Sequence, residues 1–311
     1  MNEFELSQLT IAPAENDADL EAWSHVWSVV APEAHPEVKN LRFNLDSNKD
    51  LAYLVGRLGD EAVACAFVEP VADFARADIR VVPARRRRGI GSVLLVEVSD
   101  RARRLGKDSL EGEVKESDTE SRGYFERRGF AQVGAEKALV LELDGLELPP
   151  VEPPAGVRIV TRIDEPDRLE EMYALALQGD EDIPGSPGGQ KFEEWRAHEI
   201  DKPDRRPELT FLALVGDEVV GYAGLQAHEK DVFHGLTVTR RDWRRRGVAT
   251  ALKRAEIAAA KRAGYRRLLT ESEERNEPMR RLNEKLGFVP APEWSAVVLR
   301  GPAQTADRRT I

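Results

Sequence analysis

The sequence predicts two consecutive α+β domains built to one plan, and three observations carry this prediction. The chain has 311 residues, about twice the length of a typical single domain. Its landmarks recur at one offset: Arg244 lies 158 residues after Arg86, and Gly287 lies 158 residues after Gly129. Each half also has the same order of a hairpin, a strand ending at an arginine-rich glycine turn, a helix, a strand, a short helix and a last strand. A repeat on this scale indicates a tandem duplication.

The expected elements follow from the patterns of apolar residues. Helices are predicted around 18–29 and 167–177, ahead of hairpins at 51–68 and 210–225. The strands that end at the two glycine turns are predicted at 79–82 and 233–239, and the helices after them at 93–105 and 251–260. The next strands are predicted at 110–114 and 267–270, and the last strands at 138–141 and 296–299.

A proline-rich segment marks the boundary between the two halves. Residues 148–156 contain four prolines, a composition that favours an extended, semi-rigid spacer. We therefore place the first domain at 1–146, a linker at 147–156, the second domain at 157–302 and a polar tail at 303–311.

Composition and charge exclude several classes of protein. With 41% hydrophobic residues the chain suits a folded domain. Its 46 Lys and Arg against 56 Asp and Glu give a net charge of −10, whereas a nucleic-acid-binding protein usually has a basic excess. The single cysteine, Cys65, lies in an apolar run and is expected to be a buried thiol, so neither a disulfide framework nor a metal site is predicted. Residues 1–5 carry no basic leader, and no apolar run is long enough for a membrane span, so we expect a soluble, cytoplasmic protein with no membrane partner.

The repeated glycine turn has the chemistry of an anion site. Residues 86–91 and 244–249 follow the pattern Arg-x-x-Gly-x-Gly/Ala between a strand and a helix. The first turn of a helix presents unpaired backbone N–H groups, and glycine lets a pyrophosphate approach them. The spacing is not that of a dinucleotide-binding fingerprint, and the Gly-Lys-Ser/Thr of a nucleotide-triphosphate loop is absent from both turns.

Around these turns the sequence resembles the GNAT superfamily of N-acetyltransferases. The resemblance rests on residues 81–91 in the first half and on 237–249 with Leu286-Gly287-Phe288 in the second. It extends to a tandem group of the family that is common in actinobacteria. The resemblance implies a mixed β-sheet in each domain, flanked by helices and splayed open where the pantetheine arm of the cofactor lies. It also implies acetyl-CoA, or another acyl-CoA, as donor and a primary amine as acceptor.

Carried over by position, the family motif assigns a set of cofactor-binding residues to each domain. In the first domain these are Val81, Val82, Pro83, Arg86, Arg87, Arg88, Gly89, Ile90, Gly91 and Ser92. In the second they are Thr237, Val238, Thr239, Arg244, Arg245, Arg246, Gly247, Val248, Ala249, Thr250 and Asn276, whose counterpart is Asp118. A backbone N–H at the splayed strand edge would stabilise the oxyanion that forms on attack.

Departures from the family pattern concern the general acid. Many members have a tyrosine four residues before the glycine of the Gly-Phe pair, where this chain has Phe125 and Asn283. Either Tyr124 substitutes in the first domain or that domain lacks the acid. Asn283 donates a hydrogen bond but is not a proton source at neutral pH.

The general base has several candidates. His234 lies 13 residues before Gly247, where family members often carry a base, and Arg76 at the matching place cannot accept a proton. A packed or strand-end histidine is an equal interpretation of His234. Glu271 and Glu273 are alternatives, and exposed carboxylates near a loop are the plainer interpretation of both. The acidic segment 179–189 is either an acceptor-binding loop that attracts a cationic amine or an ordinary solvated loop.

The sequence thus predicts an acyl-CoA-dependent N-acyltransferase that moves an acetyl group from acetyl-CoA to a primary amine of a small molecule by direct attack. The second domain is the predicted catalytic copy, and the first is the degenerate one. The alternative is a non-catalytic acyl-CoA-binding or interaction protein of the same fold. Neither the acceptor nor the oligomeric state follows from the sequence.

Overall fold

The structure, a computed structural model, describes residues 7–32, 34–148, 150–184, 186 and 188–305. Residues 1–5, linker residue Pro149 and tail residues 306–311, on which some predictions fall, lie outside these ranges. The chain divides into two compact units. The first unit comprises the chain up to Val114, Asp118–Val133 and the chain from Val297 on. The second unit comprises Lys115–Ser117 and Gly134–Ala296.

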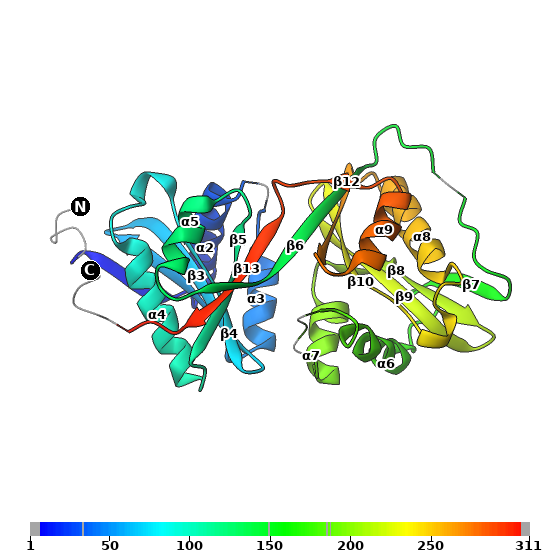
Figure 1. The fold of residues 1–311 in the computed structure, drawn as a ribbon, viewed down its shortest axis with the longest axis horizontal. Helices are drawn as coiled ribbons and strands as arrows, with labels where there is room; N and C mark the ends of the chain where they lie inside the picture. The colour runs from blue at the N-terminus through cyan, green and yellow to red at the C-terminus, as the bar shows by residue number, and fades with distance from the viewer. Residues whose placement is uncertain (1–6, 33, 149, 185, 187, 306–311) are drawn as a thin grey trace. The chain divides into compact units, whose positions relative to one another are not determined.

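The first unit is a mixed sheet with helices packed on it, with strand order β1-β2-β3-β4-β5-β13 (Figure 1). Its elements are β1 (Leu9–Pro13), α2 (Asp17–Val30), α3 (Val38–Ser47), β2 (Ala52–Leu58), β3 (Glu61–Val71), β4 (Phe74–Val81), η1 (Pro83–Arg85), α4 (Ile90–Arg104), β5 (Ser109–Lys115), α5 (Thr119–Glu126) and β13 (Ala296–Pro302).

The second unit repeats this plan, with strand order β6-β11-β10-β9-β8-β7 and the short β12 also on β6. Its elements are β6 (Ala131–Glu142), β7 (Val157–Thr161), α6 (Leu169–Asp180), α7 (Phe192–Arg196), the π-helix η2 (Ala197–Asp201), β8 (Arg205–Val215), β9 (Glu218–His228), β10 (Asp231–Thr239), η3 (Arg241–Trp243), α8 (Val248–Arg262), β11 (Arg267–Glu273), α9 (Glu277–Lys285) and β12 (Val289–Pro290). The predicted mixed α and β architecture in two copies is confirmed.

Strand alternation explains the layers of the second unit. Successive side chains of a strand point to opposite faces of the sheet. Leu212 and Leu214 of β8 pack with α6 and α7, whereas Phe211 and Ala213 of the same strand pack with α8. The sheet therefore lies between α6/α7 on one face and α8 on the other. Fully burying a side chain such as Leu212 contributes about 1.5–3 kcal/mol.

The last strand of each half lies in the sheet of the other unit. Strand β6, from the first half, pairs antiparallel with β11 from Glu136↔Glu273 to Glu142↔Arg267, and β13, from the second half, lies beside β5 (Figure 1). The boundaries 1–146 and 157–302 follow the duplication along the chain, but the compact units cross them at these two strands. Each last strand carries a similar short apolar run, so each suits the edge of either sheet.

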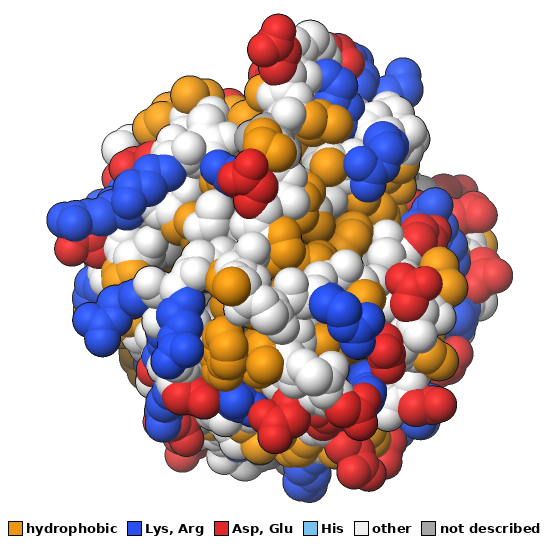
Figure 2. Space-filling view, turned by 90° about the vertical axis from the view of Figure 1, so that its right-hand side faces the viewer, with side chains coloured by type: hydrophobic (Ala, Val, Ile, Leu, Met, Phe, Trp, Pro, Cys, Tyr) orange, Lys and Arg blue, Asp and Glu red, His pale blue; other side chains and the backbone are white. Residues whose placement is uncertain are grey.

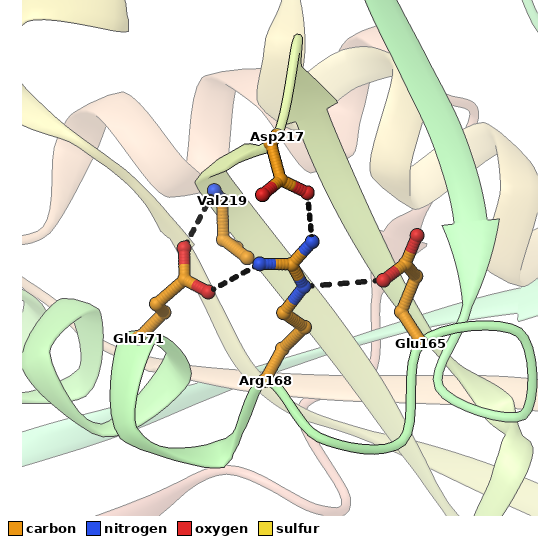
Figure 3. Close-up of polar contacts among 5 residues, drawn as sticks. All are labelled: Glu165, Arg168, Glu171, Asp217 and Val219. Carbon is orange, nitrogen blue, oxygen red and sulfur yellow. Dashed lines mark hydrogen bonds and ion pairs between the residues drawn. The ribbon is translucent and has the colours of Figure 1, made fainter.

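A buttress of charged side chains fixes the start of α6 (Figure 3). The guanidinium of Arg168 donates to Glu165 at 3.1 Å, to Glu171 at 3.0 Å and to Asp217. Glu171 in turn accepts from the backbone N–H of Val219 at 3.0 Å. These contacts, the hydrogen bond to Asp217 first, raise the pKa of Arg168 further above its usual range. The buttress joins α6 to the β8–β9 turn and so sets where the far end of α6 meets the sheet.

The surface drawn in Figure 2 carries Lys and Arg side chains interspersed with Asp and Glu, rather than a continuous field of one sign. Among the described residues, no helix has the length and apolar character that crossing a membrane requires.

Candidate functional site

The two glycine turns have nearly identical backbone conformations. Arg87 and Arg245 are both left-handed, with φ of 61° and 59°. Gly89 and Gly247 follow with φ of 85° and 91°, and each caps the helix that comes next. Two left-handed residues so close together fold the backbone into a concave turn whose N–H groups face one side, which is how backbone amides gather around an anion. Both copies have kept the conformation that the predicted phosphate site requires.

One arginine in each turn braces it against the preceding strand. The guanidinium of Arg86 donates to the carbonyl oxygen of Val81 at 3.0 Å, and Arg244 donates to Thr239 at 3.0 Å. These two side chains therefore fold back on β4 and β10. The backbone N–H groups of the two arginines also donate within the preceding 3-10 turns, to Pro83 and Arg241, so the N–H groups open to a phosphate are those of the residues that follow.

The backbone N–H groups at the start of each helix suit the predicted anion site. In α4 the first N–H that bonds within the helix is that of Ser92, which donates to Gly89. In α8, Ala251 donates to Gly247. The N–H groups that precede them carry the positive end of the helix dipole and face outward.

Acidic side chains already contact the turn of the second unit. Asp182 accepts from Arg244 at 2.5 Å, and Glu181 accepts from Arg241 at 2.5 Å. Both carboxylates belong to the acidic segment 179–189, of which Gly185 and Pro187 lie outside the described residues. This part of the segment is therefore held against the arginine turn through exposed ion pairs, each contributing about 0–1 kcal/mol.

The parallel strands next to each turn separate before they reach it. Strands β4 and β5 pair only at Ala75↔Leu110 and Arg76↔Glu111. Strands β10 and β11 pair from Asp231↔Arg267 to Phe233↔Leu269, while β10 continues to Thr239. The predicted cofactor segments 81–83 and 237–239 thus lie at strand ends beyond an opening between strands. The amide-rich arm of a cofactor can pair with backbone groups there.

Only the second unit interrupts the strand at this opening. The pairing of β10 with β9 shifts between His234 and Thr237, so that Gly235 and Leu236 face the single residue Gly224. In the first unit, β4 pairs with β3 without interruption from Phe74 to Val81. A bulge releases backbone groups from the ladder, and bulges are over-represented beside active sites.

His234 lies on the face of the sheet covered by α8, not in the opening. Its side chain is 1% exposed, its Nδ1 is 3.1 Å from Glu256 Oε2, and its ring lies against Phe288 at 5.6 Å between centroids. Burial lowers the pKa of His234, with nearby Lys253 adding to the effect. A base must reach the incoming amine, so this buried position does not suit the role that the spacing predicted. The packed-histidine interpretation describes the observed environment.

His234 belongs to a buried polar group that the first unit lacks. Lys253 and Glu256, both on α8, are buried. The residues 158 positions earlier are Leu95 and Val98, which are ordinary core side chains of α4. Burial lowers the pKa of Lys253 to about 8, against the opposing effect of Glu256.

The residues at the predicted acid position differ between the units. Asn283 is fully buried, and its two side-chain polar atoms have no hydrogen-bond partner among the described residues. Phe125 packs against Phe130 at 5.2 Å between ring centroids. The hydroxyl of Tyr124 donates to Ser92 Oγ at 3.2 Å, which places Tyr124 at the phosphate turn. Tyr124 is therefore turned away from the place that Phe125 occupies.

Three further predicted residues lie at the end of β11 and the start of α9. Asn276 begins α9 without a side-chain capping bond, whereas Asp118 caps α5 by accepting from the backbone N–H of Ser121 at 2.9 Å. The amide of Asn276 is thus available to a ligand in a way that Asp118 is not. Glu271 is exposed on β11, and Glu273 is buried and accepts from Arg275 at 2.6 Å.

One cluster beside the bulge was missed at the sequence level. Arg205 is 6% exposed and donates to Glu199 at 2.9 Å. Asp180 lies at the end of α6, within the segment predicted only as an acidic loop. No motif spacing connects these residues, because they come from separate elements that meet only in the folded unit. The π-helix that carries Glu199 is, like the bulge of β10, a local feature typical of functional sites.

Each unit thus places a left-handed glycine turn at the start of a helix, beside two parallel strands that separate. The chain belongs to the Acetyltransferase (GNAT) family, whose family model matches it twice, at residues 17–130 and 169–288. The predicted family and its tandem arrangement are confirmed. The fold supports acyl-CoA-dependent N-acyl transfer in general terms.

Solved structures share the fold over nearly the whole chain. A GCN5-related N-acetyltransferase from Sphaerobacter thermophilus is 21% identical, with a TM-score of 0.73 over 98% of this chain and 99% of that one. A tandem GNAT protein from the clavulanic acid biosynthesis pathway is 24% identical, with a TM-score of 0.75 over 96% and 100%. Saccharomyces cerevisiae N-myristoyltransferase, solved with myristoyl-CoA, is 13% identical, with a TM-score of 0.69 over 95% and 78%. At these identities the likeness concerns the fold alone. No curated protein sequence matches the chain.

Proposed function

We propose that the second unit transfers an acetyl group from acetyl-CoA to a primary amine of a small molecule by direct attack. The observation that carries the proposal is the bulge at Gly235 and Leu236, which lies in the opening between β10 and β11 and leads to the glycine turn. A strand that only served the sheet would keep its pairing, as β4 does in the first unit.

Each part of the donor has a matching feature in the second unit. The pyrophosphate would bind the backbone N–H groups of residues 245–250, since that of Arg244 donates to Arg241. The pantetheine arm would lie in the opening between the strands, where the Asn276 amide is available to it. A backbone N–H released by the bulge would stabilise the oxyanion as the amine adds to the thioester carbonyl. The thiolate of coenzyme A then leaves, and Asn283, at the position where family members often carry the acid, is not a proton source for it.

A second role fits the first unit better than catalysis does. Its glycine turn has the same conformation, but β4 is uninterrupted and the face covered by α2 is filled with aromatic rings. We infer that the first unit binds acyl-CoA without transferring the acyl group. A small-molecule partner, rather than a nucleic acid or a membrane, suits the turn arginines, several of which are paired with carboxylates. A cytoplasmic location suits a donor found there.

Titration calorimetry with acetyl-CoA tests both roles. Gly247→Glu places a negative side chain in the second anion site, and Gly89→Glu is its matched control in the first, at a similar φ. We expect two sites in the wild type and one in each variant, with acetyl transfer to amines lost only in Gly247→Glu. Thermal melts of both variants separate loss of a site from loss of the fold. Binding that survives in the double variant contradicts the assignment of the turns.

A further inference from the structure

Four polar residues gather on the α6/α7 face of the second unit, beside the bulge of β10. Asp180 comes from the end of α6, Glu199 from the π-helix η2, Arg205 from the start of β8 and Tyr222 from β9. Arg205 contacts Glu199, Tyr222 pairs with Val238 of β10, and Gly179 next to Asp180 packs against the same Val238. This is the face opposite His234.

Arg205 holds Glu199 at the bulge. Besides Glu199, the buried guanidinium donates to the carbonyl oxygen of His198 at 3.2 Å. When the side-chain amide of Gln226 is oriented with its oxygen toward Arg205, this oxygen accepts from Arg205 Nη1 at 3.0 Å. A Cβ added to Gly235 would lie 2.5 Å from Arg205 Nη1. Only glycine at the bulge lets the guanidinium approach so closely, so Arg205 and Glu199 are fixed relative to the released backbone.

Asp180 is placed at the bulge by its neighbour Gly179. A Cβ on Gly179 would lie 3.2 Å from Val238 Cγ2 and 3.6 Å from Leu236 Cδ1, so the end of α6 rests directly on β10. Burial raises the pKa of Asp180, and the charge of Glu199 raises it further. A carboxylate with a raised pKa is a stronger base, which suits general-base catalysis near neutral pH.

Among the carboxylates around the bulge, the ion pairs leave Asp180 as the one that can take up a proton. Glu199 is paired with Arg205, Glu181 with Arg241, and Asp182 with Arg244. Within the described ranges, no ion pair joins Asp180 to a cation. The hydroxyl of Tyr222 accepts from Trp195 Nε1 at 3.4 Å, and burial raises the pKa of Tyr222, so this group stays neutral.

We propose that Asp180 is the general base of the second unit and that Glu199, positioned by Arg205, receives the ammonium group of a cationic acceptor. This rests on the function proposed above. Asp180 takes one proton from the ammonium and leaves a neutral amine. The nitrogen lone pair forms the C–N bond to the thioester carbonyl carbon, and the C–S bond breaks with its electron pair going to sulfur. The proton that the nitrogen then releases neutralises the thiolate.

The first unit supports this assignment by contrast. The same face, between α2 and strands β2–β4, holds Trp23 against Trp27 at 4.8 Å and against Tyr53 at 4.7 Å between ring centroids. Arg80 lies 3.6 Å from the centre of the Trp27 ring and is paired with Asp78. Aromatic packing of this kind gives a stable core. The polar cluster of the second unit is therefore not a requirement of the fold.

The test is acetyl transfer by wild type, Asp180→Asn, Glu199→Gln and the exposed control Glu193→Gln, with acetyl-CoA and three probe amines: lysine, glucosamine and spermidine. We expect Asp180→Asn to lower kcat by about 10²–10⁴-fold with an unchanged KM for acetyl-CoA. Its residual rate should rise with pH as the ammonium form of the acceptor loses its proton in solution. The part of the wild-type pH profile that comes from the titration of Asp180 should be absent. Glu199→Gln should raise mainly the KM for the amine, and Glu193→Gln should match the wild type.

A second measurement follows the carboxyl carbon of Asp180 by NMR across pH, assigned by its loss in Asp180→Asn, with and without each probe amine. A raised apparent pKa and an amine-dependent shift support the proposal. Wild-type rates and pH profile in Asp180→Asn overturn it. If the wild type acylates none of the three amines, the proposed acetyl transfer to such amines is contradicted. The NMR titration then tests the role of Asp180 on its own. An Asp180 that titrates normally and does not respond to any amine then overturns it.

Discussion

The two units share a left-handed glycine turn, the proposed anion site, and differ in what surrounds it. The first unit keeps β4 fully paired and fills the adjoining face with Trp23, Trp27, Tyr53 and Phe67. The second unit breaks the pairing of β10 and places Asp180, Glu199 and Arg205 on that face. In the first unit the charged pair of that face, Arg80 with Asp78, lies against Trp27. The turn is compatible with a fully regular sheet, as the first unit demonstrates. The irregular strand and the polar face are therefore the features on which the proposed catalytic role of the second unit rests.

The cores beneath α4 and α8, the helices that follow the glycine turns, also differ in polarity, with the second unit again the more polar. Leu95 and Val98 in the first unit correspond to Lys253 and Glu256 in the second, and all four are buried. Burying charged groups generally costs more free energy than packing apolar residues of similar size. The second unit therefore retains groups that weaken it. The experiments below test the comparison, beginning with the largest expected effect.

Removing residues 297–311 should unfold the first unit while sparing the second. The deletion takes away most of β13 and exposes the hydrogen-bonding edge of β5, although the missing segment comes from the other half of the chain. Amide hydrogen exchange should show protection lost in β4 and β5 and retained in β9 and β10. Deleting only 306–311 serves as the control. Equal loss of protection in both units would show that β13 does not stabilise the first unit more than the second.

Gly235→Val should lower acetyl transfer by at least about 100-fold. Its Cβ would meet Arg205 Nη1 at 2.5 Å and the Gly224 carbonyl oxygen at 3.1 Å, so the bulge and the guanidinium must move apart. A displacement of about 1 Å at a reacting centre costs a rate factor of this order. The matched change in the first unit, Ala77→Val, should leave the rate within about twofold. Equal losses in the two variants would remove the functional distinction between the units.

Trp23→Ala should destabilise the first unit by about 3–5 kcal/mol without changing the kcat of acetyl transfer. The indole is buried, and its Nε1 donates to the carbonyl oxygen of Ala66 at 2.8 Å. Urea unfolding monitored by hydrogen exchange resolves the two units. A fall in kcat under conditions where the first unit remains folded would indicate that the aromatic face takes part in catalysis.

The second unit should gain stability as pH rises. Burial lowers the pKa of Lys253 from 10.5 to about 8, so between these values the unfolded chain binds more protons than the folded one. The free energy of unfolding therefore increases with pH across that window, by on the order of 1–3 kcal/mol. The lowered pKa of His234 acts in the same direction below pH 6.5. Urea unfolding at pH 6, 8 and 10 measures the slope.

The double variant Lys253→Leu, Glu256→Val installs the residues of the first unit and should flatten this pH dependence above pH 8. Replacing both charges together avoids leaving one buried charge without compensation, so the variant should fold. A slope that persists in it would mean that other groups carry the linkage.

The sequence was sufficient to predict the structural features that depend on residues close together along the chain. The glycine turns, the helices after them and the duplication could be predicted because each depends on a short motif and one repeated spacing. The strand exchange could not, since 138–141 and 296–299 are similar runs and either suits either sheet edge. Their partners are decided by the whole fold.

The general base illustrates the same limit. Spacing selected His234, but a bulge one residue later changes which side chains face which layer, and His234 points under α8. Asp180 and Glu199 come together only because α6 and the π-helix pack beside β10. A one-residue insertion in a strand leaves no reliable mark in a single sequence.

The exchanged strands also bear on how such a chain arises. If the two halves were once separate copies, a pair of identical chains that traded their final strands would be a domain-swapped dimer. Joining them end to end through a proline-rich connector would keep the exchanged strands within one polypeptide. Each copy could then diverge while remaining unable to leave its partner, because each would still depend on the other for the strand that completes its sheet. Such mutual dependence would let one copy lose chemistry without being lost from the chain.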